Sequence, residues 1–333
     1  MFRPLVNLLS CSFVALTITT CFAQTPPKSA SPDTATAQRG LKLAQIGNCA
    51  EALPLLKKAM RQTTDKDMRK TIGLTAVRCA MTHNLAYDSL DFLQILVRDF
   101  HSDPEVLYQA THAFSDLSLH SSQDLAREAP FSYQVHLLNA EALELQGNWD
   151  AAAAEYRKII EINPFLPGIH ARLGRALISK PQPTPSVIEQ AKKNFEEELE
   201  IDPNNPAAEY VLGELAKDAS DWSAAIHHYS RATKIDTSFA EAYLGLGSAL
   251  VSSKRFADAI PPLETYEKLA PDSPSGHFQL ALAYAGVGRK EDANRQAALQ
   301  RQSAESLEQV KRRAADALLK QSDQGTQPAA PPQ

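Results

Sequence analysis

Histidine side chains are the first candidates for chemistry, because imidazole can bind metals or transfer protons near neutral pH. The chain has nine of them. His136, His170 and His277 each stand four residues before a small residue, at matching places in similar segments. Side chains at matching places are separated by a whole segment, so they cannot converge on one ion. We therefore expect these histidines to pack between helices.

Carboxylates are the second candidates, since paired acids can act as general acid and base. The run Glu196–Glu198 follows Lys192 and Lys193 at i, i+4 spacing on a stretch with helical periodicity. Such pairs on a helix surface form weak, solvated ion pairs. The sequence contains no His-Glu-x-x-His, no Gly-x-Ser-x-Gly and no nucleotide-binding glycine loop. We therefore expect no enzymatic activity, no cofactor, no metal and no small-molecule substrate.

The composition indicates a folded and mainly helical chain. Of its 333 residues, 44% are hydrophobic and 22% are charged, which is enough apolar material for a packed core. The formal net charge is −5, so no basic field exists to attract nucleic acid. Glycine is scarce, while alanine, leucine, glutamate and lysine fill periodic runs, which favours helix.

The N-terminal residues have the layout of a signal peptide. Arg3 precedes an apolar run from Leu5 to Thr20, and Cys21 and Ala23 then place small residues three and one before Gln24. This arrangement predicts a signal peptide over residues 1–23, with cleavage after Ala23 and export to the periplasm or the medium.

Two alternatives remain open for this segment. It could stay uncleaved as a membrane anchor, or a lipid could be attached to Cys11 or Cys21. Either alternative would make the protein envelope-anchored, with membrane association only through the N-terminus.

Three segments share one pattern, and its recurrence defines a repeat. An aromatic residue opens a helix, an alanine follows three residues later, and a proline or threonine closes the helix twelve residues after the alanine. The positions are Trp149, Ala152 and Pro164, then Trp222, Ala225 and Thr237, then Phe256, Ala259 and Pro271. Thr237 and Pro271 are 34 residues apart, as are Pro203 and Thr237. Leu-Gly pairs stand in the preceding helices at 173–174, 212–213 and 246–247.

This pattern resembles that of the tetratricopeptide-repeat family, whose 34-residue unit is a helix–turn–helix. With its N-terminus, the chain resembles an exported bacterial member of that family. The resemblance implies an all-α fold, a right-handed α-solenoid of tandem helix pairs. Physically, the glycine of the first helix and the alanine of the second let the two helices approach closely, and the aromatic side chain fills the space beside them. Proline ends each repeat because it lacks the N–H of another turn.

The resemblance divides the chain into four parts. After the signal peptide we expect a flexible linker over 24–37, a repeat domain over 38–320 and a disordered tail over 321–333.

Within the repeat domain, we expect a shortened helical pair from Pro104 to Pro130 and a proline-rich loop over Lys180–Pro185. The stretch Ser303–Lys320 is expected to be a C-terminal capping helix. Its apolar face, expected to point inward, comprises Leu307, Val310, Ala314 and Leu318.

In this family, ligands commonly lie on the concave wall formed by the first helices, so the resemblance implies a binding surface there. The side chains at the corresponding positions are Leu137, Glu141, Arg175, Tyr210, Glu214, Leu244, Ser248 and Phe278. A largely apolar row flanked by mixed charges suits an extended peptide or a partner helix. The function expected is an exported protein–protein interaction scaffold. The alternatives are an envelope assembly factor, anchored at its N-terminus, and a wall that only contacts the second helices and binds nothing.

Cys49 and Cys79 are the cysteines that signal-peptide cleavage would leave. Cys49 is expected just before the second helix of the first repeat, the chain turns near residues 63–66, and Cys79 lies about as far along the next helix. The two thiols should therefore end at the same height on neighbouring antiparallel helices, which predicts a disulfide. The alternative is two buried free thiols.

Overall fold

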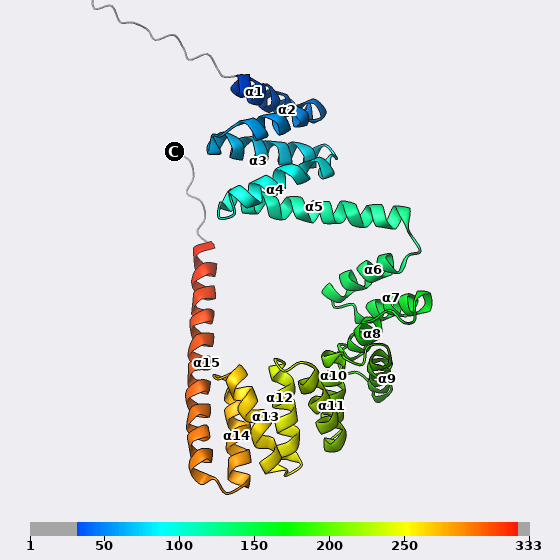
Figure 1. The fold of residues 1–333 in the computed structure, drawn as a ribbon, viewed down its shortest axis with the longest axis vertical. Helices are drawn as coiled ribbons and strands as arrows, with labels where there is room; N and C mark the ends of the chain where they lie inside the picture. The colour runs from blue at the N-terminus through cyan, green and yellow to red at the C-terminus, as the bar shows by residue number, and fades with distance from the viewer. Residues whose placement is uncertain (1–31, 326–333) are drawn as a thin grey trace, which may run out of the picture. The chain divides into compact units, whose positions relative to one another are not determined.

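A computed structural model describes residues 32–325, and all regular elements in this part of the chain are helices (Figure 1). The expected signal peptide and most of the expected linker lie outside the described residues, as does the end of the expected tail. The chain divides into two compact units, residues 1–124 and 125–333. The all-α repeat fold is confirmed.

Unit 1 consists of antiparallel helices joined by short turns. They are α1 (Pro32–Gln45), α2 (Cys49–Gln62), α3 (Lys66–Thr82), the 3₁₀ helix η1 (Ala86–Ser89), α4 (Leu90–Asp99) and α5 (Pro104–Glu128), whose last turn passes the boundary. Each of α1 to α3 packs against the next helix, and the fully buried side chains of Leu56, Met60, Ile72, Leu93 and Leu96 form the core.

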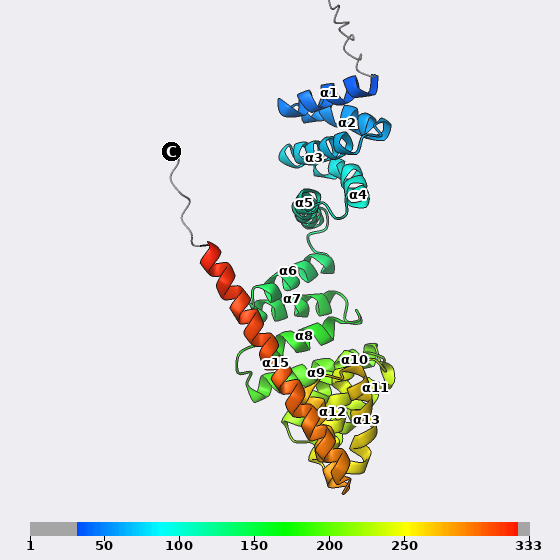
Figure 2. The same cartoon turned by 90° about the vertical axis from the view of Figure 1, so that its left-hand side faces the viewer.

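Unit 2 is a series of five helix pairs stacked on one another (Figure 2). The pairs are α6 (Tyr133–Leu145) with α7 (Trp149–Ile162), α8 (Ile169–Ile178) with α9 (Pro185–Ile201), α10 (Pro206–Asp218) with α11 (Trp222–Ile235), α12 (Ala240–Ser252) with α13 (Phe256–Leu269), and α14 (Pro274–Gly286) with α15 (Lys290–Gly325). Polar side chains start several of these helices by accepting a backbone N–H, for example Asn148 for α7 and Asp221 for α11.

The glycines of the first helices lie against large side chains of the second helices, as the repeat pattern predicts. A Cβ added to Gly174 would lie 2.8 Å from Cε2 of Phe195. Gly213 on α10 and Gly245 on α12 both contact the ring of Tyr229, which is fully buried on α11. Backbone and ring can approach this closely only because glycine has no side chain.

Two expectations about the elements are wrong, and one is confirmed. Residues 104–128 form one continuous helix, α5, instead of a helical pair. No glycine or proline follows Pro104 before Glu128, so nothing in that stretch breaks the helix. The proline-rich loop between α8 and α9 is present, and it ends where Pro185 starts α9 with Thr184 as its cap.

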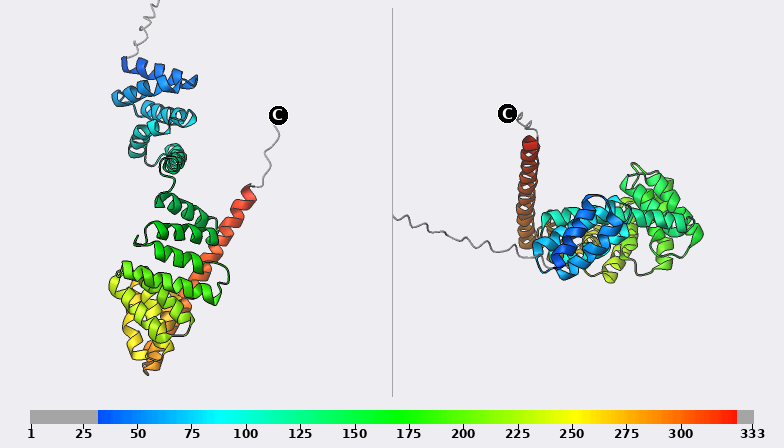
Figure 3. Two further views of the ribbon diagram at one scale, coloured as in Figure 1. Left: turned by 90° about the vertical axis from the view of Figure 1, so that its right-hand side faces the viewer. Right: turned by 90° about the horizontal axis from the view of Figure 1, so that it is seen from above.

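The second wrong expectation is the inward-facing capping helix. Residues 290–325 form a single helix, α15, whose first part packs on α14. All residues from Glu305 to Ala317 are exposed, including Leu307 at 45% and Val310 at 58%, so no other helix of unit 2 covers the described part of the apolar face (Figure 3). The side chain of Leu318 lies outside the description.

Both ends of the helical region are longer than expected. α1 begins at Pro32, inside the expected linker, and α15 continues to Gly325, inside the expected tail. Among the described residues no helix is long and apolar enough to cross a membrane.

Candidate functional site

The eight residues of the expected binding surface lie on the first helix of each pair in unit 2. They are Leu137 and Glu141 on α6, Arg175 on α8, Tyr210 and Glu214 on α10, Leu244 and Ser248 on α12, and Phe278 on α14. Because α10 contacts α12 and α12 contacts α14, the last three of these helices form a continuous surface. We call the surface that carries the eight residues the first-helix wall.

The part of the first-helix wall on α6 and α8 is charged. Arg172 of α8 donates to Glu141 of α6 at 2.8 Å, and both side chains are about 40% exposed. Arg175 lies 3.6 Å from Glu144 and is largely exposed. These pairs link neighbouring first helices and present both signs of charge to solvent. Exposed pairs of this kind add little stability, so their charges are available to a partner at small cost.

The central part, on α10, is aromatic. The ring centroid of Tyr210 lies 5.8 Å from that of Tyr229 and 5.0 Å from that of Phe239, so neighbouring rings hold Tyr210 on two sides. The hydroxyl of Tyr229 donates to Glu214. Burial, followed by the charges of Glu214 and Glu241, raises the pKa of Tyr210 to about 12. Burial and the bond to Glu214 also raise the pKa of Tyr229, so both rings stay neutral at physiological pH.

The part on α12 and α14 is apolar. Leu244 and Ser248 are half-buried, and Leu244 packs on the core of the last repeats. Phe278 is 50% exposed, and Leu282, one turn later on α14, is 39% exposed. This pair is an exposed apolar feature of the first-helix wall, and covering it with a partner would be favourable.

The row of apolar side chains is thus less exposed than the sequence pattern implied. Leu137, Tyr210 and Leu244 are half-buried and serve the cores of their own repeats. Phe278 alone of the eight is both apolar and exposed. The binding role of the eight residues stays a prediction.

Two buried carboxylates were not anticipated, and one of them corrects the expectation of a fully solvated acidic run. Glu198 of α9 is fully buried. Its carboxylate accepts the N–H of Gly168 at 2.7 Å and that of Ala171 at 3.2 Å, so it caps the start of α8. Gly168 adopts φ +87° and has no side chain to cap with, so the cap comes from the neighbouring helix.

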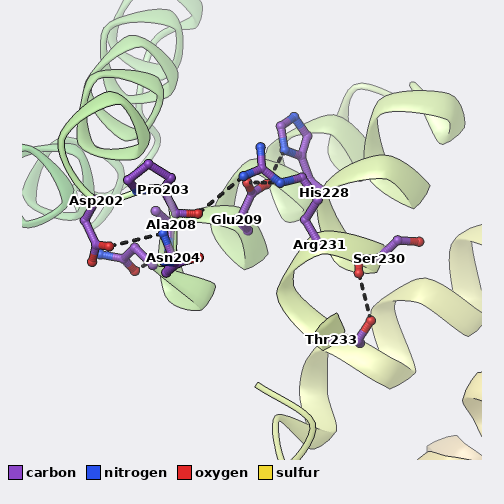
Figure 4. A network of polar contacts seen from close by, with 10 residues as sticks. Asp202, Pro203, Asn204, Ala208, Glu209, His228, Ser230, Arg231 and Thr233 are labelled. Carbon is purple, nitrogen blue, oxygen red and sulfur yellow. Dashed lines mark hydrogen bonds and ion pairs between the residues drawn. The ribbon is translucent and has the colours of Figure 1, made fainter. Parts of the chain in front are cut away.

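Glu209 of α10 is the second buried carboxylate (Figure 4). It lies 2.7 Å from Nδ1 of His228 and 2.9 Å from Nε of Arg231, both on α11. Arg231 also donates to the carbonyl oxygen of Pro203. A buried carboxylate paired with two basic groups fixes the joint between α10 and α11, which is a structural role.

The histidines pack as expected. His170 and His277 are buried, and the Nε2 atoms lie 3.2 Å and 2.9 Å from the carbonyl oxygens of Pro164 and Pro271, which close the preceding repeats. His136 pairs with Glu155 of α7 at 2.7 Å. Each of the three therefore joins its first helix to a neighbouring segment.

Cys49 and Cys79 are neighbours, as the antiparallel helices require. Their Cα atoms are 5.6 Å apart, which is in the range of disulfides, and the sulfur atoms are at bonding distance. Both residues are buried. The structure also places His83 beside them, with Nδ1 3.2 Å from Sγ of Cys49. Formation of the disulfide in the protein itself stays a prediction.

The chain is similar to known proteins over part of its length. A family model described as "Tetratricopeptide repeat" matches residues 114–167 and 210–274. Anaphase-promoting complex subunit 3 of Schizosaccharomyces pombe is 26% identical over 156 residues, which are 45% of this chain and 23% of that protein. The chain therefore spans about a quarter of the length of this relative.

Solved structures of two proteins have a similar arrangement of helices. MamA is 21% identical with a TM-score of 0.47, over 52% of this chain and 92% of MamA. YrrB, described as a tetratricopeptide-repeat protein with an unusual peptide-binding site, is 18% identical with a TM-score of 0.48, over 55% of this chain and 91% of YrrB. At these identities and scores, neither similarity says what the present chain binds.

Proposed function

Since the chain is a tetratricopeptide-repeat protein, we propose that it is a scaffold that binds a peptide or a partner protein on the first-helix wall of unit 2. The exposed apolar pair Phe278 and Leu282 carries this proposal. Aromatic and aliphatic side chains that become buried on association supply most of the affinity of protein interfaces. The wall offers such a pair on α14, whereas the apolar side chains of the wall on α10 and α12 are half-buried.

The rest of the wall indicates the chemistry of the partner. Tyr210 supplies a rigid aromatic edge on α10, because two neighbouring rings hold it. The charges of Glu141, Arg172 and Arg175 lie on α6 and α8. A matching segment would carry an apolar anchor for α14 and charged or polar groups of both signs toward α6. An amphipathic helix or an extended peptide has this character.

Binding suits this arrangement better than catalysis. Both buried carboxylates described above are held in structural contacts, Glu198 by two backbone N–H groups and Glu209 by His228 and Arg231. Groups held in this way are not free to transfer protons to a substrate. The proposal therefore includes no cofactor, no nucleic acid and no small-molecule substrate.

A pair of variants tests the surface. Replacing Phe278 and Leu282 by alanine should weaken binding of a purified partner about 10-fold or more, because it removes a hot-spot pair. Phe165→Ala is the matched control, since Phe165 is 77% exposed but lies in the turn before α8. Equal affinity of the double variant and the unmodified protein in calorimetric titration, with unchanged helicity, would rule out the first-helix wall as the binding surface.

We also propose that the protein is exported. The support is the sequence of residues 1–23, which the structure does not describe, with its apolar run and small residues before Gln24. N-terminal sequencing of material from outside the cytoplasm should start at Gln24. Retention of Met1, or a lipidated cysteine at the N-terminus, would favour the envelope-anchored assembly factor instead.

A further inference from the structure

Cys49, Cys79 and His83 bring three potential metal-ligating atoms together in unit 1. Their ligand atoms all lie within 4.8 Å of one another. Cys49 is the first residue of α2, Cys79 lies in the last turn of α3, and His83 is the C-cap that follows α3. Cys79 and His83 are four residues apart, so they project from the same side of the helix. No other group of this kind occurs in residues 32–325.

We propose that these three residues form a Zn²⁺ site when the two cysteines are reduced. Two thiolates and one imidazole are ligands that Zn²⁺ prefers, and three protein ligands leave a fourth position open to water or to another group. This site is built from residues of unit 1 alone, whereas the first-helix wall belongs to unit 2, so the site does not depend on the proposed function.

The geometry needs little change to admit the ion. With Zn–S distances of about 2.3 Å and a tetrahedral angle, the two sulfur atoms would stand about 3.8 Å apart. The Cα atoms, 5.6 Å apart, allow this separation by rotation of the cysteine side chains alone. Nδ1 of His83 is already 3.2 Å from Sγ of Cys49, close to the spacing of two ligands on one ion.

The imidazole can present the required lone pair. When Nε2 carries the ring proton, Nδ1 is unprotonated and faces the sulfur atoms. The Nε2 side of the ring lies next to Gly47 in the turn before α2, where an added Cβ would be 3.4 Å away. Without the ion, Nδ1 lies 3.1 Å from the carbonyl oxygen of Cys79 and 2.9 Å from Oγ1 of Thr82, whose own proton goes to the carbonyl oxygen of Arg78, so Nδ1 is the donor. Metal binding therefore requires the ring proton to move from Nδ1 to Nε2.

The charges at the site also favour a divalent cation. Cys49 stands at the N-terminus of α2, where the helix dipole stabilises a thiolate. The two cysteines are buried, so two thiolates there would be costly without a cation, and Zn²⁺ neutralises both. His83 is exposed, which gives the ion a path from solvent.

The disulfide and the metal site exclude each other. A dithiol reductant gives two electrons and two protons to the Cys49–Cys79 bond, which breaks into two thiols while the reductant becomes a disulfide. Binding of Zn²⁺ then releases the two thiol protons to solvent as the thiolates coordinate the ion. The same pair would therefore be a structural bridge under oxidising conditions and a metal site under reducing conditions.

The test uses Co²⁺ as a coloured substitute for Zn²⁺ on the chain from Gln24 onward, which lacks Cys11 and Cys21. Thiols are first counted on the unreduced protein, and the protein is then reduced with a dithiol that is removed anaerobically. The reduced protein should bind one equivalent of Co²⁺ with a thiolate-to-cobalt absorption band, and Zn²⁺ should displace it. His83→Ala should weaken binding roughly 10-fold or more, because a ligand is lost. His101→Ala, which changes another exposed histidine of unit 1, should bind normally.

Other outcomes would overturn the proposal. One is reduced protein with no thiolate-to-cobalt band, and another is a His83→Ala variant with unchanged affinity. A third is oxidised protein that binds Co²⁺ as tightly as reduced protein. Circular dichroism accompanies each titration, and loss of helix on reduction that Co²⁺ does not reverse would also contradict the site. None of these outcomes bears on the first-helix wall.

Discussion

Gly245→Ala should show how tightly the repeats of unit 2 are packed. A Cβ at this position on α12 would lie 2.6 Å from Cε1 of the Tyr229 ring and 2.7 Å from Cζ. The ring cannot easily move away, because Tyr229 is fully buried, contacts Gly213 on α10 and donates its hydroxyl to Glu214. The added methyl group therefore has to displace packed atoms.

The expected free-energy change is the sum of two opposing effects. Overpacking of a core costs about 1–3 kcal/mol. Alanine is better than glycine inside a helix by about 1 kcal/mol. We expect Gly245→Ala to lower the free energy of unfolding by about 1 kcal/mol. With Tyr229→Ala in the background the overpacking disappears, and the same substitution should raise that free energy by up to about 1 kcal/mol.

The assay is urea unfolding followed by circular dichroism, with midpoint and slope both recorded. Ser252→Ala is the control, since Ser252 is exposed on the same helix and its substitution should change stability by less than about 0.5 kcal/mol. If Gly245→Ala raises the unfolding midpoint equally with and without the Tyr229 ring, the absence of a side chain at Gly245 is not needed for packing against Tyr229, and the reasoning is refuted.

Three further predictions concern other parts of unit 2. Glu198→Ala should lower the free energy of unfolding by about 1–3 kcal/mol in thermal unfolding, because the first turn of α8 loses its cap. Glu196→Ala, on the exposed side of α9, should be neutral, and equal effects of the two substitutions would contradict the capping role. Burial raises the pKa of Tyr284 to about 12, as it does for Tyr210, so their contribution to stability is complete below pH 10 and lost between pH 10 and 12. The Tyr284→Phe variant should therefore lose less unfolding free energy than the unmodified protein between pH 10 and 12. An identical dependence of stability on pH in the two proteins would contradict this role of Tyr284. Truncation before Glu305 should leave the melting temperature nearly unchanged, because residues 305–317 are all exposed, and a drop of several degrees would reveal a stabilising contact.

The helix pairs could be predicted from the sequence because their determinants are local. Trp222, Ala225 and Thr237 recur at fixed offsets, and each offset corresponds to one contact within or between neighbouring helices. The continuity of α5 could also have been inferred, since no helix-breaking residue separates its halves.

Other features depend on which segments meet in space. Glu198 resembles its acidic neighbours in sequence, and only the position of Gly168 on another helix makes it a buried cap. His83 gains significance from Cys49, which lies 34 residues earlier. The apolar face of α15 follows a clear helical period, but periodicity does not say whether a partner helix exists to cover it. The exposure of Phe278 could not be predicted from the repeat pattern, because Leu244 at the equivalent position of another repeat is half-buried.

The central claim, binding on the first-helix wall, can be tested most directly by site-specific photocrosslinking in the native host. A photoreactive benzoylphenylalanine at position 278 should give a discrete adduct with a partner protein on irradiation. The same group at position 165, where the native phenylalanine is 77% exposed, should give none. Adducts at both positions with equal yield, or at position 165 alone, would contradict the assignment of the first-helix wall as the binding surface.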